Sequence, residues 1–284
     1  MSELDGTRQA TPADRTGRDH LIDLDQPSEA RLYDLFLGGK NNFEVERRLF
    51  QELIEIAPEA PELARENRRW LAEVIGRMIT DGGISQFLDL GAGLPTRQNT
   101  HEIAVAADPT AKVVYVDSDP TAISHGQALL ADDRTSFFAG ADLTDPASVL
   151  KHPDVTAALD LNRPVGIILG LVLHTIPDTD RIERVIAEYL AAVPSGSYLA
   201  LSHPMNPRDG SRLAEFSTAI EEKVREAFPQ LQFRTRPEIA RFFTGLDLVE
   251  PGLVDLTAWW PGTDQQVSPT GAAQLLLVAL ARKP

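Results

Sequence analysis

The chain has 284 residues, 43% of them apolar, and a formal net charge of −15 at pH 7. This length and apolar content suit one large α/β domain with a core, and the negative charge argues against nucleic acid or an anionic membrane as partner. The absence of cysteine excludes disulfides, thiolate catalysis and cysteine-ligated metals. No apolar run approaches the roughly 20 residues that span a bilayer. The N-terminus lacks a signal-peptide core, so we expect a cytoplasmic protein.

The N-terminal part predicts a polar arm followed by helices. Residues 1–25 are polar without periodicity, which is typical of a flexible arm. Ser28 can cap the first helix, and Gly38-Gly39 would end it. The apolar stripe of the third helix repeats with the period of a helix face. The three expected helices are Glu29–Leu37, Phe43–Ile56 and Pro61–Thr80.

After Gly83 the pattern changes to short apolar runs that alternate with amphipathic segments. Strands that are apolar on both faces and alternate with helices predict a parallel sheet covered on both sides. Further helices are expected over Asp209–Phe228 and from Pro237 to Phe243. The expected strands are Gln86–Leu90, Lys112–Val116, Thr135–Phe138, Val165–Leu169 and Tyr198–Ser202, then Leu246–Leu256 and Gln274–Ala281.

Three features at consecutive strand ends indicate a nucleotide-type cofactor. The first strand, which contains Asp89, runs into a turn with Gly91 and Gly93, where a ligand can approach bare backbone. The second strand ends in Asp117, placed to accept hydrogen bonds from ribose hydroxyls. The third is followed by Asp142, placed to accept a hydrogen bond from an adenine amino group. Each acid alone could equally cap a helix, whereas the ordered set is far more specific.

A nicotinamide dinucleotide is the competing cofactor. Its fingerprint requires a third glycine, where this chain has Thr96 preceded by Pro95. The turn also lacks a clear helix start on which to seat a pyrophosphate. A cofactor without phosphate therefore fits the sequence better.

Several longer segments carry a more specific pattern: Pro27–Asp34 with Gly38–Phe43, Gln86–Glu102 and Val113–Pro120. Shorter ones follow at Leu173-His174, Gly196–Leu199, Ser202-His203, Val249–Val254 and Arg282–Pro284. With these motifs the sequence resembles the class I S-adenosylmethionine (SAM) dependent methyltransferases. It is most similar to the S-adenosyl methyltransferase family once filed as a domain of unknown function, from about residue 25 to the end.

The resemblance implies a Rossmann-like α/β fold with a seven-stranded, mostly parallel sheet, its last strand inserted antiparallel and helices on both faces. After the flexible arm expected over 1–25 from its composition, it implies a helical cap over 26–83 and a SAM-binding methyltransferase domain over 84–284. Asp89, Gly91 and Gly93 would line the methionine end of SAM, and Asp117 would hold the ribose, flanked by Ser118 and Asp119. Asp142 and Leu143 would meet the adenine.

Methyl transfer depends largely on orienting donor and acceptor, and a base helps when the nucleophile starts protonated. Candidate bases are His174, just after the fourth strand, and His203, at the end of the fifth. The alternative for both is a structural histidine.

The loop that follows the first helix is a candidate lid. Lys40 would reach the cofactor carboxylate or a substrate anion, and Tyr33 would line the same pocket; a helix stop and helix packing are the alternatives. Together these features predict an enzyme that methylates a small molecule. A SAM-binding sensor or partner subunit without activity and an NAD-dependent oxidoreductase stay as alternatives, because fold alone does not decide function.

Overall fold

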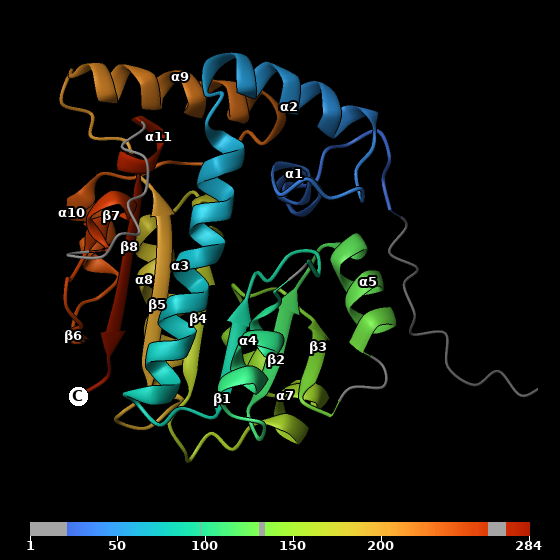
Figure 1. The fold of residues 1–284 in the computed structure, drawn as a ribbon, viewed down its shortest axis with the longest axis vertical. Helices are drawn as coiled ribbons and strands as arrows, with labels where there is room; N and C mark the ends of the chain where they lie inside the picture. Colours follow the sequence, from blue (N-terminus) through green and yellow to red (C-terminus); the bar gives the residue numbers. More distant parts are fainter. Residues whose placement is uncertain (1–21, 97, 131–133, 261–270) are drawn as a thin grey trace, which may run out of the picture.

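The computed structural model describes residues 22–96, 98–130, 134–260 and 271–284, so most of the predicted N-terminal arm lies outside the described residues. The described residues form one eight-stranded sheet in the order β3-β2-β1-β4-β5-β8-β6, with β7 also paired to β8 (Figure 1). Its five parallel strands are β1 (Gln86–Leu90), β2 (Lys112–Asp117), β3 (Ser136–Gly140), β4 (Gly166–Gly170) and β5 (Tyr198–Pro204). The final strand β8 (Leu276–Arg282) lies antiparallel between β5 and β6. The predicted mostly parallel sheet and its inserted last strand are confirmed.

The single strand predicted over Leu246–Leu256 was wrong. The structure has two short strands there, β6 (Asp247–Leu248) and β7 (Val254–Asp255), and each pairs separately with β8. Pro251 has no N–H to donate to a ladder, and Gly252 has a φ of +88°. This turn therefore interrupts a segment whose composition resembles that of one strand.

Helices cover both faces of the sheet, as the sequence predicted. Alternate side chains of β1 point to opposite faces: Phe87 packs with Trp70 of α3, whereas Leu88 packs with Ile186 of α8. The first core holds α3 (Ala60–Thr80) and α4 (Thr100–Ala107), and the second holds α7 (Pro153–Ala158), α8 (Thr179–Ala191) and α10 (Arg236–Arg241). None of the described helices is both long and apolar enough to cross a membrane.

Two N-terminal helices, α1 (Glu29–Phe36) and α2 (Glu44–Ile56), lie with α9 (Arg212–Ala227) beyond the carboxyl ends of the parallel strands (Figure 1). Ser28 caps α1 by accepting from the N–H of Arg31, as predicted, and its hydroxyl also donates to Asp119 over 2.6 Å. Arg31 forms a buried ion pair with Glu46 at 2.8 Å. Because α3 packs against the sheet itself, it is not part of this layer. We call the layer formed by α1, α2 and α9 above the strand ends the cover.

The remaining elements are short connections around this frame. They are α5 (Pro120–Leu130), α6 (Pro146–Leu150), α11 (Gly271–Gln274) and the 3-10 turns η1 (Leu173–Thr175) and η2 (Leu256–Ala258).

Candidate active site

A cavity of ≈ 530 Å³ lies where the strand ends meet the cover, within the roughly 300–1,000 Å³ typical of small-molecule sites. Its lining comes from the glycine turn, from the loops after β2, β3 and β4, and from α1, α2, α3 and α9. The sequence-predicted residues that line it are Tyr33, Asp89, Gly91, Gly93, Asp117, Ser118, Asp119, Asp142, Leu143 and His174.

The glycine turn is braced by Asp117. The N–H of Gly93 donates to one oxygen of this carboxylate over 2.7 Å, and the N–H of Asp119 donates to the other over 2.8 Å. Gly91 and Gly93 have φ values of +71° and +67°, which disfavour a side chain. A Cβ on Gly93 would lie 4.0 Å from that of Ala30, in the space between turn and cover. At Gly93 the turn therefore presents bare backbone to the cavity, and each Asp117 oxygen keeps capacity for a further bond.

Asp119 and Asp142, in the loops after β2 and β3, differ in how many hydrogen bonds they already accept from the protein. Asp119 accepts from the N–H groups of Thr121 and Ala122 and from the Ser28 hydroxyl, so it caps α5 and ties α1 to it. Asp142 is exposed, and one of its oxygens accepts both the N–H and the hydroxyl of Thr144, at 2.8 Å each. Asp142 thus keeps more capacity for a ligand than Asp119 does.

Asp89 is buried beside the glycine turn. Burial raises its pKa to about 6, although the Thr100 hydroxyl donates to it over 2.7 Å and the charge of Arg68 favours the carboxylate. Arg68 lines the cavity from α3 and donates to the Gln98 carbonyl over 2.6 Å. Sequence reasoning missed Arg68, because on the polar side of a helix it resembles a solvent-facing charge.

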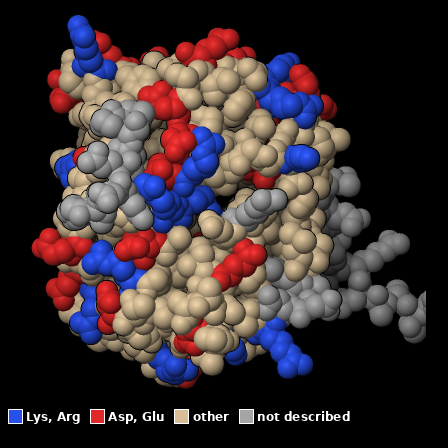
Figure 2. All heavy atoms as spheres, viewed as in Figure 1, with Lys and Arg blue, Asp and Glu red and all other residues tan. Residues whose placement is uncertain are grey.

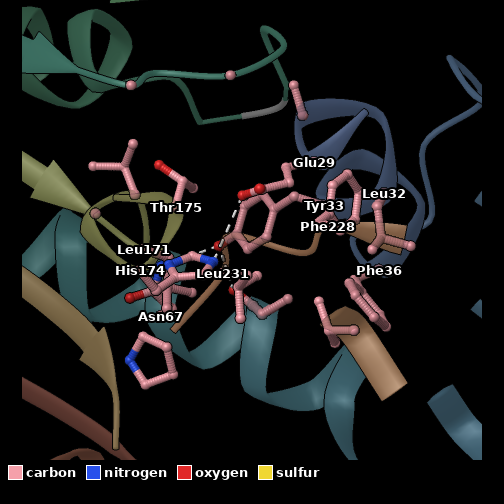
Figure 3. A pocket seen from close by; sticks show the side chains of 18 of the residues that line it. Glu29, Leu32, Tyr33, Phe36, Asn67, Leu171, His174, Thr175, Phe228 and Leu231 are labelled. Atoms are coloured by element: carbon pink, nitrogen blue, oxygen red, sulfur yellow. Dashed lines mark hydrogen bonds and ion pairs between the residues drawn. The ribbon is translucent and has the colours of Figure 1, made fainter. Parts of the chain in front are cut away.

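His174 lines the cavity from η1, where its Nε2 lies 3.7 Å from a carboxylate oxygen of Glu29 (Figure 3). Burial and the charge of Arg234 lower the pKa of His174 to about 4, so its ring is neutral at pH 7. Burial, followed by the charge of Asp117, raises the pKa of Glu29 to about 7. Sequence reasoning missed Glu29 as well, because an acidic residue in the first turn of a helix is usually explained by its favourable interaction with the helix dipole.

The placement of His203 corrects its predicted role as a base. It is fully buried and is not among the residues that line the cavity. Its Nδ1 donates to the Pro204 carbonyl over 2.7 Å, and its Nε2 accepts from Arg234 over 3.2 Å. Both ring nitrogens are occupied, so we assign His203 a structural role.

Arg234 connects this histidine to the turn that carries His174. Its guanidinium is fully buried and donates to the carbonyls of Leu173 and Ile176 on either side of the turn, at 3.2 and 2.5 Å. Hydrogen bonds from a charged donor to buried carbonyls are stronger than neutral ones. Arg234 therefore holds the η1 backbone in place.

Lys40 is exposed and lies outside the cavity lining, so we propose no cofactor contact for it. Its loop is held by the buried Asp34, which accepts the N–H of Asn41 over 3.0 Å and fills the space where a Cβ on Gly39 would lie. Tyr33 lines the cavity, and its hydroxyl accepts from Asn67 over 3.0 Å.

Acidic side chains dominate the charged part of the lining, which favours a cationic ligand. On the face shown in Figure 2 both signs are interspersed, and Arg65 and Arg69 of α3 pair with Glu62 and Glu66. Among the described residues no His, Asp and Glu group is arranged to hold a metal ion. The acidic lining residues are Glu29, Asp89, Asp117, Asp119 and Asp142, and Arg68 is the basic one.

Residues 15–284 match the sequence profile of the S-adenosyl methyltransferase family. The chain belongs to this family. SAM is therefore the cofactor of this S-adenosyl methyltransferase family member, and the cavity fits it on three grounds. The turn has no side chain at Gly93, the oxygens of Asp117 can still accept hydrogen bonds at the strand end, and the surrounding carboxylates attract the sulfonium and ammonium groups of SAM.

Solved structures of two similar proteins cover almost the whole chain. A proposed methyltransferase from Thermobifida fusca YX is 40% identical, covering 92% of this chain and 97% of its own, with a TM-score of 0.85. A DUF574 family protein from Streptomyces avermitilis MA-4680 is 33% identical, covering 93% and 100%, with a TM-score of 0.86. At 16% identity and a TM-score of 0.50, an O-methyltransferase family 2 protein from Planctomyces limnophilus DSM 3776 shares the fold, covering 84% of this chain and 61% of its own. A comparison with curated proteins finds no match.

Proposed function

We propose that this protein transfers the methyl group of SAM to a small-molecule acceptor bound beneath α1 and α9. The observation that carries the proposal is one continuous cavity, lined at one end by the glycine turn and at the other by apolar side chains of the cover. Its ≈ 530 Å³ would hold both partners, which limits the acceptor to a small molecule.

We assign the cofactor contacts to residues at the strand ends and on α3. Arg68 would bind the carboxylate of the methionine end, and Asp89 would pair with its ammonium group. Asp117 would accept from the ribose hydroxyls, and Asp142 with Leu143 would meet the adenine. SAM supplies an electrophilic methyl group on a sulfonium when it is bound.

Glu29 is the proton acceptor in this proposal, and His174 lies beside it. Glu29 lies between the two ends of the cavity, since it faces His174 and the charge of Asp117 acts on it. With a pKa of about 7, its carboxylate can take a proton from an acceptor at neutral pH. The neutral His174 lies 3.7 Å from Glu29, beyond hydrogen-bond distance, and adds no charge beside it at pH 7.

Turnover in an acceptor screen tests the proposal. The purified protein is incubated with SAM and a panel of small alcohols, phenols and amines, and release of S-adenosylhomocysteine (SAH) is measured. Turnover with one acceptor class, reduced in Glu29→Gln but not in Lys40→Gln, is the expected result. Tight SAM binding with no turnover in the whole panel would favour a SAM-binding sensor, and binding of NADH in place of SAM would favour an oxidoreductase.

A further inference from the structure

The cavity ends in an apolar chamber away from the glycine turn. Phe36 of α1, Leu53 of α2, and Val224 and Phe228 of the α9 region line it and belong to one hydrophobic cluster. Leu231 adds to this lining from the segment that follows. No charged side chain contributes to this part of the described lining, so an occupant must offer apolar surface to all of these residues.

A cluster of polar groups lies beside this chamber. In Figure 3 the polar ends of Glu29, Tyr33, Asn67 and His174 point toward one another, with Leu32 and Phe36 to one side. The amide nitrogen of Asn67 donates to the Tyr33 hydroxyl, which donates in turn to the Ala64 carbonyl over 3.3 Å. The cluster therefore has a fixed orientation.

Two atoms of this cluster have no hydrogen-bond partner among the described residues. One is Oδ1 of Asn67, a side chain that is only 1% exposed, and the other is Nδ1 of His174. Buried polar atoms are nearly always paired, because an unmade hydrogen bond in the interior is costly. Both atoms are buried within the lining rather than exposed in the cavity, so a small rotation of each side chain would bring its unpaired atom to a bound molecule.

The chemistry of these atoms selects the partner. Oδ1 of Asn67 accepts only, so it requires an O–H or N–H, whereas a neutral imidazole nitrogen can donate or accept. A single hydroxyl satisfies both, since it donates one hydrogen and accepts another. An anionic group would meet the carboxyl of Glu29, which lies 3.7 Å from His174.

We propose that the acceptor is an uncharged, mainly apolar molecule that presents one hydroxyl group to Asn67, His174 and Glu29. The proposal rests on the methyl transfer proposed above and specifies its substrate class and the oxygen as the methylated atom. The hydroxyl oxygen forms a bond to the methyl carbon while the carbon–sulfur bond breaks and its electron pair stays on sulfur. The hydroxyl hydrogen turns from Asn67 to the Glu29 carboxylate, which takes the proton and releases it to solvent, so the products are a methyl ether and SAH.

Binding of four matched probes to the SAH-loaded protein tests the substrate class without requiring turnover. The probes are 2-naphthol, naphthalene, 2-naphthoate and 2-naphthylmethylamine, followed through the fluorescence of their rings. We expect 2-naphthol to bind about tenfold tighter than naphthalene, because it pairs two buried atoms, and tighter than either ion. Tightest binding of either the ammonium probe or the carboxylate probe would overturn the proposal.

Two variants locate the site. Asn67→Leu should reduce the preference for 2-naphthol over naphthalene. Val224→Phe should weaken the binding of all four probes, because the larger side chain fills the chamber. Glu222→Phe, on the exposed side of α9, is the matched control and should change nothing. SAH affinity, measured by calorimetry, should stay at the wild-type value in all three variants, which shows that they are folded.

The outcomes separate this proposal from the one on which it rests. Selective 2-naphthol binding without turnover in any acceptor screen would contradict the methyl transfer alone. Turnover of a charged acceptor would confirm the transfer and overturn the substrate class. If each probe bound to wild type and to Val224→Phe with equal affinity, the assignment of the chamber as the acceptor site would be overturned.

Discussion

Replacing Asp117 with alanine removes the group that holds the glycine turn and, in our assignment, the ribose. Its carboxylate accepts two backbone N–H groups, at 2.7 and 2.8 Å. Leaving either donor unpaired costs about 1–3 kcal/mol of stability, so the melting temperature should fall. Hydrogen bonds from the ribose to a charged acceptor contribute about 1.5–3 kcal/mol, so the Kd for SAM should rise roughly 10- to 150-fold.

Calorimetric titration with SAM and SAH measures this change, with thermal unfolding as a separate record of stability. Asp108→Ala is the matched control, because its carboxylate also accepts two bonds in a turn, at 2.9 and 2.8 Å from Thr110, but lies outside the cavity lining. We expect wild-type SAM affinity in the control. A folded Asp117→Ala protein with wild-type affinity would refute the assignment of the ribose site.

Three further predictions concern charges in and behind the cavity. In a pH–rate profile, turnover should rise with pH through a midpoint at or below about 7, because only the carboxylate form of Glu29 takes the proton and cationic SAM lowers the pKa of Glu29 further. The Glu29→Gln variant should show no such rise. Arg68→Met should weaken SAM binding about tenfold by calorimetry, whereas Arg65→Met, outside the cavity lining, should not. Arg234→Met should lower the free energy of unfolding by about 1–3 kcal/mol in a denaturant titration, because carbonyls around the His174 turn lose their donor.

Each of these has an opposite outcome that is equally clear. A wild-type pH profile that is flat, or falls, through this range would remove Glu29 as the proton acceptor. Equal SAM affinities in the two arginine variants of α3 would remove Arg68 from the cofactor site. Unchanged stability in Arg234→Met would show that water replaces its hydrogen bonds.

The parallel strands and the acids that follow them were predictable because buried parallel strands have continuous apolar sequences. Asp117 and Asp142 follow such runs, so their place at the sheet edge could be inferred from chain order. The strand expected over Leu246–Leu256 failed because the apolar composition outweighed the interruption at Pro251-Gly252.

The residues proposed for chemistry were harder to find, because they lie on helices that tertiary packing brings to the strand ends. Glu29 and Arg68 occupy positions in α1 and α3 that are typical of solvent-facing charges. The packing of α1 above the glycine turn and of α3 against the sheet brings these two side chains to the cavity. His203 shows the converse: its position at a strand end predicted a base, yet the buried Arg234 occupies its second nitrogen.

We propose methyl transfer from SAM to a small hydroxyl-bearing acceptor. Mass spectrometry with SAM deuterated in its methyl group follows this transfer directly. The protein is incubated with this SAM and a panel of uncharged apolar alcohols and phenols. We expect a deuterated methyl ether and an equal amount of SAH, both reduced in Glu29→Gln. Tight SAM binding with no labelled product from any acceptor would contradict the proposed transfer.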